Sequence, residues 1–314
     1  MIHSPDSFRP FDLAGDADYR VWRAWKLDGY PVATADLLVE VGDPAHLSAA
    51  EHAAILARCR KANMAIYAAR DGGSADKEAV RALGRQFGLE RLDMNLRADE
   101  DSITALRAVP ESAGTHYIPY TNRPLNWHTD GYYNTLDEQV QAILMYCVSA
   151  AASGGESLLF DHELAYLLLR DENPDYIRAL MQPDAMTIPA NIEDGRQIRG
   201  AQSGPVFTVE KGSNALHMRY TARTRSIEWK DDRDVRNAIK FLRELLDSDL
   251  PWIFRHRLQA GQGIICNNVL HRREAFEDAA GDGQARLLYR ARYHDRIRAT
   301  VADNDFYGDR QCCG

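Results

Sequence analysis

Long apolar runs are absent from this sequence of 314 residues, since no stretch approaches the roughly 18 consecutive apolar residues that a membrane-spanning helix needs. Residues 1–16 are polar, contain two prolines and lack the apolar core of a secretory signal peptide. Cysteine is also scarce: the 5 cysteines have no zinc-site spacing, and the adjacent Cys312 and Cys313 are assigned no role. We therefore expect a cytoplasmic protein with reduced thiols that does not bind membranes.

Basic clusters are missing as well. The formal net charge is -8, and no long block of lysine and arginine offsets it. This excludes nucleic acid and anionic membrane surfaces as expected partners. Hydrophobic residues make up 45% and charged residues 27%, as in ordinary globular proteins. With no internal repeat, the sequence predicts a single domain over residues 1–314.

The pattern of apolar residues predicts strands throughout the chain and helices in two groups. Helices are expected at 48–63, with Ser48 as N-cap, and at 77–87, 164–170, 174–181 and 235–246. Strands are expected at 64–69, 103–109, 140–148, 157–160, 252–258, 263–270 and 286–293. The aromatic segment 117–133 is predicted to be an irregular loop, and Gly154-Gly155 a turn.

This order lacks the strand–helix alternation of a parallel α/β sheet. It predicts a mainly β fold with α additions, in which an antiparallel barrel or jelly roll carries the helices. A helix–strand region is expected up to about residue 100 and the barrel over about 101–300. A helical insertion is expected over about 161–250.

Two separate segments contain side chains suited to one metal ion. In Trp127-His128-Thr129-Asp130, an extended backbone would point His128 and Asp130 in the same direction. His271 follows a predicted strand far along the chain. Two histidines and one carboxylate form the facial triad typical of iron(II) oxygenases. A structural zinc site would need a fourth ligand, and the sequence leaves His116 or His294 open for that role.

An unusual strand closes the predicted core. With a period of two, Arg286, Leu288, Arg290 and Arg292 share one face of the predicted strand 286–293. An arginine inside a barrel requires a partner, and a carboxylate is the natural one for its planar guanidinium. Periodicity alone leaves open whether this face lies inside the barrel or in solvent.

The order of these elements resembles the taurine dioxygenase/TfdA-like family of Fe(II)/2-oxoglutarate oxygenases. The likeness rests on His128-x-Asp130, then Gly154-Gly155-Glu156-Ser157, then His271 and Arg286. A looser likeness to the γ-butyrobetaine hydroxylase branch involves residues 217–223. The resemblance implies a double-stranded β-helix, or jelly-roll, core.

The resemblance also implies the cofactors and their ligands. Iron(II) would be bound by the catalytic residues His128, Asp130 and His271. Arg286 and Ser157 would bind the distal carboxylate of 2-oxoglutarate, with Arg290 assisting. Together with O2, the co-substrate would be converted to succinate and CO2 while an unactivated C–H bond of a small molecule is oxidised.

The primary substrate is predicted only by class. Tyr120, Trp127 and Tyr132 lie close in sequence to the metal motif and could pack on a substrate, although several of them are equally explained as core residues. Arg219 and Arg223 could bind an anionic group, or could belong to a solvated charged edge. These residues favour a small charged or zwitterionic substrate.

Other function classes remain open at this stage. One is a jelly-roll metalloprotein with non-oxidative chemistry, such as a cupin-type isomerase or hydrolase; another is a non-catalytic 2-oxoglutarate sensor. Arg286 and Ser157 argue against the first, and the intact ligand set argues against the second. The sequence does not decide between hydroxylation and desaturation, and it leaves a homo-oligomer open.

Overall fold

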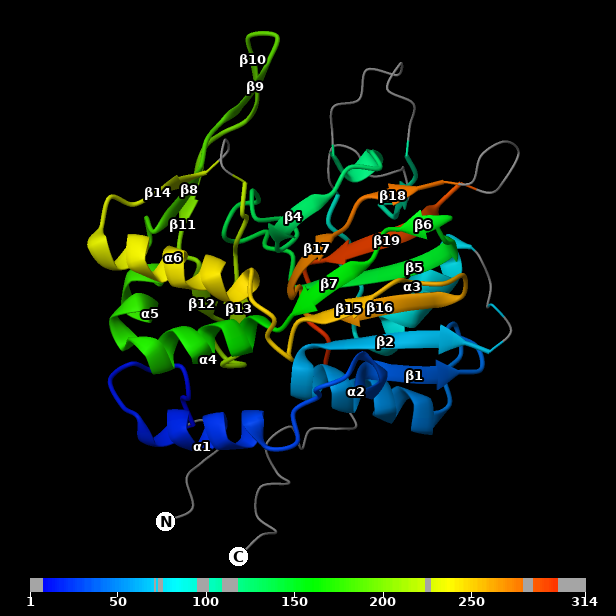
Figure 1. Ribbon diagram of the computed structural model, residues 1–314, viewed down its shortest axis with the longest axis horizontal. Coiled ribbons are helices and arrows are strands. Elements are labelled where there is room, and N and C mark those ends of the chain that lie inside the picture. Colours follow the sequence, from blue (N-terminus) through cyan, green and yellow to red (C-terminus); the bar gives the residue numbers. More distant parts are fainter. Residues whose placement is uncertain are drawn as a thin grey trace, which may run out of the picture.

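Two β-sheets face each other in the computed structural model, which describes residues 8–70, 72, 76–94, 102–108, 118–223, 227–278 and 285–298. The larger sheet has the strand order β1-β2-β16-β5-β19-β3 (Figure 1). Its strands are β1 (Leu38–Val41), β2 (Met64–Ala69), β16 (Gln262–Cys266), β5 (Ala142–Ser149), β19 (Leu287–Tyr293) and β3 (Thr104–Leu106).

The second sheet has four antiparallel strands in the order β15-β7-β17-β4. They are β15 (Phe254–His256), β7 (Ser157–Phe160), β17 (Leu270–Arg273) and β4 (Leu125–His128). Two short strands, β6 (Ser153–Gly154) and β18 (Phe276–Glu277), pair beside it. Buried residues from both sheets belong to one hydrophobic core, so the space between the sheets is a packed interior.

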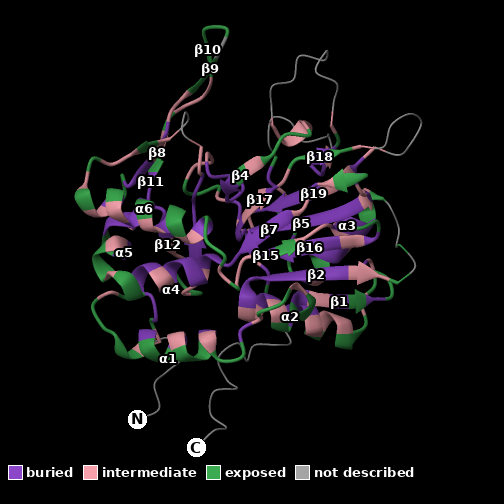
Figure 2. Ribbon diagram, in the orientation of Figure 1, coloured by how far each residue is buried: buried purple, intermediate pink, exposed green. Residues whose placement is uncertain are grey.

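The larger sheet is buried on both faces. Along β5, Ile143, Met145 and Cys147 belong to the core between the sheets, whereas Leu144 and Tyr146 belong to a second core. Helices α2 (Ala49–Ala62) and α3 (Lys77–Gln86) contribute to this second core. Burial on both sides explains the nearly continuous apolar sequence of β5, and Figure 2 shows the central strands buried along most of their length.

Helix α2 begins and ends where its sequence predicts. The Ser48 side chain accepts a hydrogen bond from the Glu51 N–H, and Glu51 accepts one from the Ser48 N–H, which forms a capping box. Asn63 ends the helix in the left-handed conformation, with φ 57°. α2 connects the parallel strands β1 and β2, as a crossover connection must.

The chain between β7 and β15 packs as a separate layer beside the sheets (Figure 1). It contains helices α4 (His162–Glu172), α5 (Pro174–Leu180) and α6 (Arg233–Leu246). Between α5 and α6 lie seven short strands: β8 (Met186–Ile188), β9 (Asn191–Glu193), β10 (Arg196–Arg199), β11 (Gln202–Gly204), β12 (Phe207–Val209), β13 (Leu216–Met218) and β14 (Glu228–Trp229). The N-terminal helix α1 (Ala17–Leu27) packs against this layer, where the Tyr19 hydroxyl donates to Asp171 and the Leu167 carbonyl.

Four sequence-based expectations need correction. The insertion contains small sheets as well as helices. The strands β1 and β2, expected outside the core, extend the larger sheet, because β2 pairs with β16 and β1 pairs with β2. The expected single strand 263–270 is divided between the two sheets by a turn at Asn267-Asn268. The expected loop 117–133, described from residue 118, contains the 3-10 turn η4 (Ile118–Tyr120) and strand β4, which forms because β17 supplies its hydrogen-bond partners. No helix among the described residues is long and apolar enough to cross a membrane.

Candidate metal centre and active site

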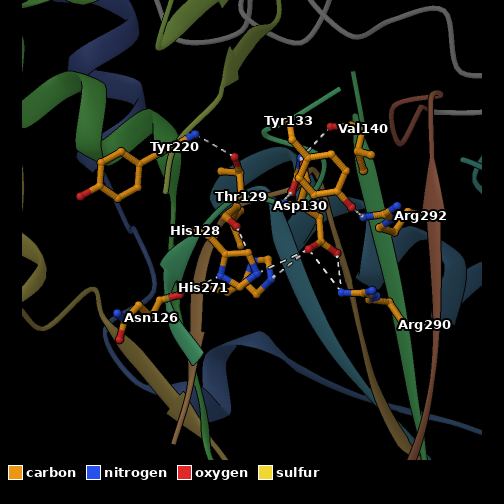
Figure 3. Close-up of polar contacts among 12 residues, drawn as sticks. Asn126, His128, Thr129, Asp130, Tyr133, Val140, Tyr220, His271, Arg290 and Arg292 are labelled. Atoms are coloured by element: carbon orange, nitrogen blue, oxygen red, sulfur yellow. Dashed lines mark hydrogen bonds and ion pairs between the residues drawn. The ribbon is translucent and has the colours of Figure 1, made fainter. Parts of the chain in front are cut away.

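Pairing of β4 with β17 brings together two histidines that are far apart in sequence. The Cα atoms of His128 and His271 are direct partners in this antiparallel register. Their ring centroids lie 4.2 Å apart. β4 ends at His128, so Asp130 lies in the following turn and not on the strand itself as the alternation argument assumed. The turn nevertheless directs its carboxylate toward both imidazoles (Figure 3).

Three donor atoms converge at this point. Asp130 Oδ1 lies 3.5 Å from His128 Nε2 and 4.0 Å from His271 Nε2. Both histidines make a hydrogen bond through Nδ1, to the carbonyls of Asn126 at 2.8 Å and of Val269 at 2.9 Å. Because a carbonyl only accepts, Nδ1 must carry the proton in each ring. This tautomer leaves Nε2 of both histidines free to bind a metal.

The electrostatics favour an ionised Asp130 carboxylate beside a neutral His271 imidazole. Burial opposes charge on Asp130, but the Arg290 guanidinium outweighs it and holds the pKa of Asp130 well below its ordinary value. Nη1 of Arg290 lies 3.1 Å from Asp130 Oδ2. Burial, together with charge on His128, lowers the pKa of His271 to about 4. At neutral pH Asp130 is therefore ionised and His271 is neutral, the protonation states that metal binding requires.

Asn268 fixes the backbone of the aspartate. Its Oδ1 accepts a hydrogen bond from the Asp130 N–H at 2.8 Å, and its Nδ2 donates to the Asp130 carbonyl at 2.9 Å and to the Val140 carbonyl at 2.6 Å. Asn268 is 1% exposed and has a φ of 48°, a left-handed conformation that asparagine tolerates. Asn268 was not among the predicted site residues, although the Asn267-Asn268 pair is a turn signal shortly before β17.

The donor set fits one metal ion with open coordination positions. His128, Asp130 and His271 each offer a ligand atom, and these atoms lie within 4.8 Å of one another. Within the described ranges no fourth such side chain joins the group, and His294 instead lies 3.8 Å from Asp93. His116 falls outside the described residues. Three neutral or anionic ligands of this kind suit iron(II) and leave room for a bidentate ligand.

A polar cavity opens beside the three ligands. Its lining combines the loop before β4, two tyrosines and three arginines: Ile118, Pro119, Pro124, Leu125, Asn126, His128, Asp130, Tyr132, Tyr133, Thr221, Arg223, Arg290 and Arg292. Arg292 bonds to the Tyr133 hydroxyl at 2.9 Å and pairs with Asp93. Asp93 therefore compensates a buried arginine at the cavity wall, and no motif around Asp93 predicts this role.

The arginine-rich face of β19 points into the core between the two sheets. Arg286, Arg290 and Arg292 are 6%, 8% and 3% exposed, and Leu288 on the same face belongs to the core between the sheets. This face of β19 therefore lies in the protein interior and not in solvent, a question that periodicity alone left open. Arg290 and Arg292 pair with Asp130 and Asp93, whereas the Arg286 guanidinium has no carboxylate bonded to it among the described residues. Burial lowers the pKa of Arg286, although the Asp278 carboxylate, which accepts a hydrogen bond from the Arg286 N–H, partly opposes this.

Two glycines shape the surroundings of Arg286. Gly154 and Gly155 have φ of 67° and 77°, and a side chain at Gly154 would lie 2.2 Å from the Ala275 carbonyl. The Arg286 guanidinium carbon lies 4.8 Å from the centre of the Phe276 ring, and Phe276 packs against Gly155. Ser157, which is buried on β7, follows two residues later.

The five predicted substrate residues lie in different environments. Tyr132 and Arg223 line the cavity, but Tyr120 and Trp127 do not. Trp127 lies next to the Arg272 guanidinium at 5.6 Å. Arg219 is 2% exposed and donates to the carbonyls of Tyr132, Met186 and Gln202. The guanidinium of Arg219, which directly follows β13, therefore bonds to β8, to β11 and to the backbone of Tyr132. Arg219 is not among the residues that line the cavity.

Two curated proteins illustrate what this chain is similar to. One is a uridine-5'-phosphate dioxygenase from Amycolatopsis sp, 32% identical over 180 residues, which are 55% of this chain and 62% of the relative. The other is a uridine-5'-phosphate dioxygenase from Streptomyces sp, 28% identical over 223 residues, which are 68% of this chain and 77% of the relative. The chain thus spans less than two thirds of the first relative's length.

Solved structures share the fold. An asparagine oxygenase in complex with Fe(II), 3-hydroxyasparagine and succinate has a TM-score of 0.53 and 16% identity, covering 80% of this chain and 85% of that one. PvcB from Pseudomonas aeruginosa has a TM-score of 0.55 and 17% identity, covering 84% and 88%. The family model for the taurine catabolism dioxygenase TauD, TfdA family matches residues 70–292. This match spans most of the sequence and confirms the predicted resemblance, so the chain belongs to the TauD, TfdA family of dioxygenases.

Proposed function

We propose that this protein is an Fe(II)/2-oxoglutarate-dependent dioxygenase that hydroxylates a C–H bond of a small anionic substrate. The observation that carries the proposal is the convergence of His128 Nε2, His271 Nε2 and the Asp130 carboxylate in one buried group. We also infer that the two facing sheets form a double-stranded β-helix, with catalysis in the cytoplasm. The balanced reaction is R–H + 2-oxoglutarate + O2 giving R–OH + succinate + CO2.

The chain's own residues have distinct parts in this reaction. His128, Asp130 and His271 would hold iron(II), which supplies the oxidising chemistry once 2-oxoglutarate and O2 are bound. Arg286 would bind the distal carboxylate of 2-oxoglutarate, because it is buried and no protein carboxylate pairs with it within the described chain. Ser157 would add a hydroxyl donor. Arg290 holds the Asp130 carboxylate in place, which is a different role from the one that the family resemblance implied.

The substrate side of the cavity favours an anion. Arg223 lines it with no ion pair among the described residues, next to Tyr132. Of the three arginines in the wall, Arg290 and Arg292 pair with Asp130 and Asp93, so Arg223 supplies the positive charge that suits a phosphate or carboxylate. Both curated relatives are named for a uridine 5'-phosphate substrate. We therefore propose a nucleoside 5'-monophosphate as the first candidate, bound through its phosphate by Arg223.

The test is a substrate panel scored by succinate release under iron(II), 2-oxoglutarate and O2. Uridine 5'-monophosphate is compared with uridine, other nucleoside monophosphates, taurine, asparagine and arginine, and Asp130→Ala serves as the inactive control. We expect succinate in excess of the substrate-free rate with a nucleoside monophosphate and little with uridine. No 2-oxoglutarate consumption with any compound, despite bound iron, would favour a sensor or non-oxidative metalloprotein instead.

A further inference from the structure

The side chain of Arg273 connects strand β17 to the loop before β4. Arg273 follows His271 by two residues on β17, so both side chains project from the same face of the strand. Arg273 is 8% exposed, and its Nη2 donates to the carbonyls of Thr121 and Arg123 at 2.8 and 2.5 Å. Its Nη1 lies 3.5 Å from the Pro119 carbonyl. A single buried guanidinium therefore bonds to three carbonyls of one short loop.

This loop, residues 118–124, forms part of the cavity wall beside the metal ligands. Ile118, Pro119 and Pro124 line the cavity. The loop is one 3-10 turn followed by bends, so no ladder of strand hydrogen bonds fixes it. The bonds from Arg273, together with one from the Phe276 N–H to the Asn122 carbonyl at 3.1 Å, join it to the chain that follows His271.

Arg273 also lies near Arg286. Their guanidinium carbons are 5.0 and 4.8 Å from the centre of the Phe276 ring. Burial and the charge of Arg286 lower the pKa of Arg273 to about 10, so Arg273 stays protonated at neutral pH. Its Nη atoms donate to carbonyl oxygens of the loop, whereas the Arg286 guanidinium has no hydrogen-bond partner among the described residues. The two neighbouring arginines are therefore in different states: one is bonded to the loop, and the other is available to a ligand.

We propose that Arg273 is a positioning residue that holds residues 118–124 in the conformation in which they wall the substrate side of the cavity, and that it is not a ligand of 2-oxoglutarate. The identification of this wall as the substrate side rests on the proposed function, whereas the hydrogen bonds from Arg273 to the loop do not depend on it. A planar guanidinium can bond to several carbonyls at once, whereas an ammonium group acts as a point charge.

Arg272 provides a matched control. It has the same side chain one position earlier but projects from the opposite face of β17. Its Nη2 donates to Glu274 Oε1 at 2.8 Å, and its guanidinium lies next to Trp127. Replacing Arg272 therefore removes one positive charge from the same strand without removing a bond to residues 118–124.

The first measurement is hydrogen exchange of the loop amides in the protein without cofactors. Arg273→Met should increase exchange in residues 118–125 by about tenfold or more, because at least two charge-assisted hydrogen bonds are lost. Arg272→Met should exchange like the wild type there, and Arg273→Lys should be intermediate. Thermal midpoints establish that each variant is folded. Unchanged exchange in Arg273→Met, or an equal increase in Arg272→Met, overturns the proposal.

The second measurement separates positioning from ligand binding. The affinity for N-oxalylglycine, a 2-oxoglutarate analogue, is measured with Mn(II), so that no turnover occurs. Arg273→Met should retain this affinity within about threefold, whereas Arg286→Met should lose on the order of tenfold or more. An equal loss in both variants would make Arg273 a ligand and overturn the proposal. If neither variant loses affinity, the proposed 2-oxoglutarate site fails, while the exchange experiment still decides the role of Arg273.

Discussion

Asn268 offers the sharpest test of how the metal centre is built. Asn268→Ala removes three buried hydrogen bonds, two of them to the backbone of Asp130, and places alanine at a φ of 48°. Each buried polar group left without a partner costs about 1–3 kcal/mol, and the left-handed backbone adds about 1 kcal/mol. We expect a loss of at least about 4 kcal/mol in the free energy of unfolding. Iron(II) affinity should fall about 10–100-fold, as for other residues that orient a metal ligand.

Asn267→Ala is the matched control. Asn267 is also buried, and its side chain makes two hydrogen bonds, to Asn63 Oδ1 at 3.0 Å and from the Ile297 N–H at 3.1 Å. Neither bond involves a metal ligand. This variant should lose about 2–3 kcal/mol of stability and keep its iron affinity.

The assay combines chemical denaturation with anaerobic iron(II) titration, both performed on the same preparations. Stability should fall in both asparagine variants, and iron affinity in Asn268→Ala alone. If Asn268→Ala binds iron like the wild type, the Asp130 backbone is held by something other than Asn268, and the reasoning is refuted. Equal iron losses in both variants would mean that the effect follows stability and not ligand orientation.

Three further outcomes are expected. Arg286→Lys should raise the KM for 2-oxoglutarate steeply. Ser157→Ala should raise this KM less, by a factor that corresponds to at most about 1.5–3 kcal/mol of binding free energy. Succinate release measures both effects. Arg223→Ala should raise the KM for uridine 5'-monophosphate with little change in the thermal midpoint, whereas Arg219→Ala should lower the midpoint because three carbonyls lose a buried donor; the reverse pattern would exclude Arg223 as the anion site. Burial lowers the pKa of His162 to about 4, below the value of about 6.5 in the unfolded chain. The contribution of His162 to the free energy of unfolding is therefore fully present above pH 6.5 and falls by about 3 kcal/mol as the pH decreases toward 4. His162→Gln should flatten the pH dependence of the free energy of unfolding between these two pH values.

The sequence by itself determined the local elements and identified the three candidate metal ligands that come together. Ser48, Glu51 and Asn63 define the ends of α2 through contacts within a few residues, and the apolar run of β5 marks a strand buried on both faces. The family resemblance rested on the order of His128, Asp130, His271 and Arg286, and the family match confirms it. Such features depend on residue type and short spacing, which a sequence displays directly.

Only the tertiary structure decided which partners satisfy each buried polar group. Pairing of β4 with β17 placed His128 opposite His271, and the Asn267-Asn268 turn moved the second histidine into the other sheet. The same packing bonded Arg219 to three carbonyls, paired Arg290 with Asp130, and left Arg286 without a protein carboxylate among the described residues. The sequence alone does not distinguish these three arginines from one another. The role of each arginine follows from the desolvation of its charge and from the acceptor that the fold brings within reach.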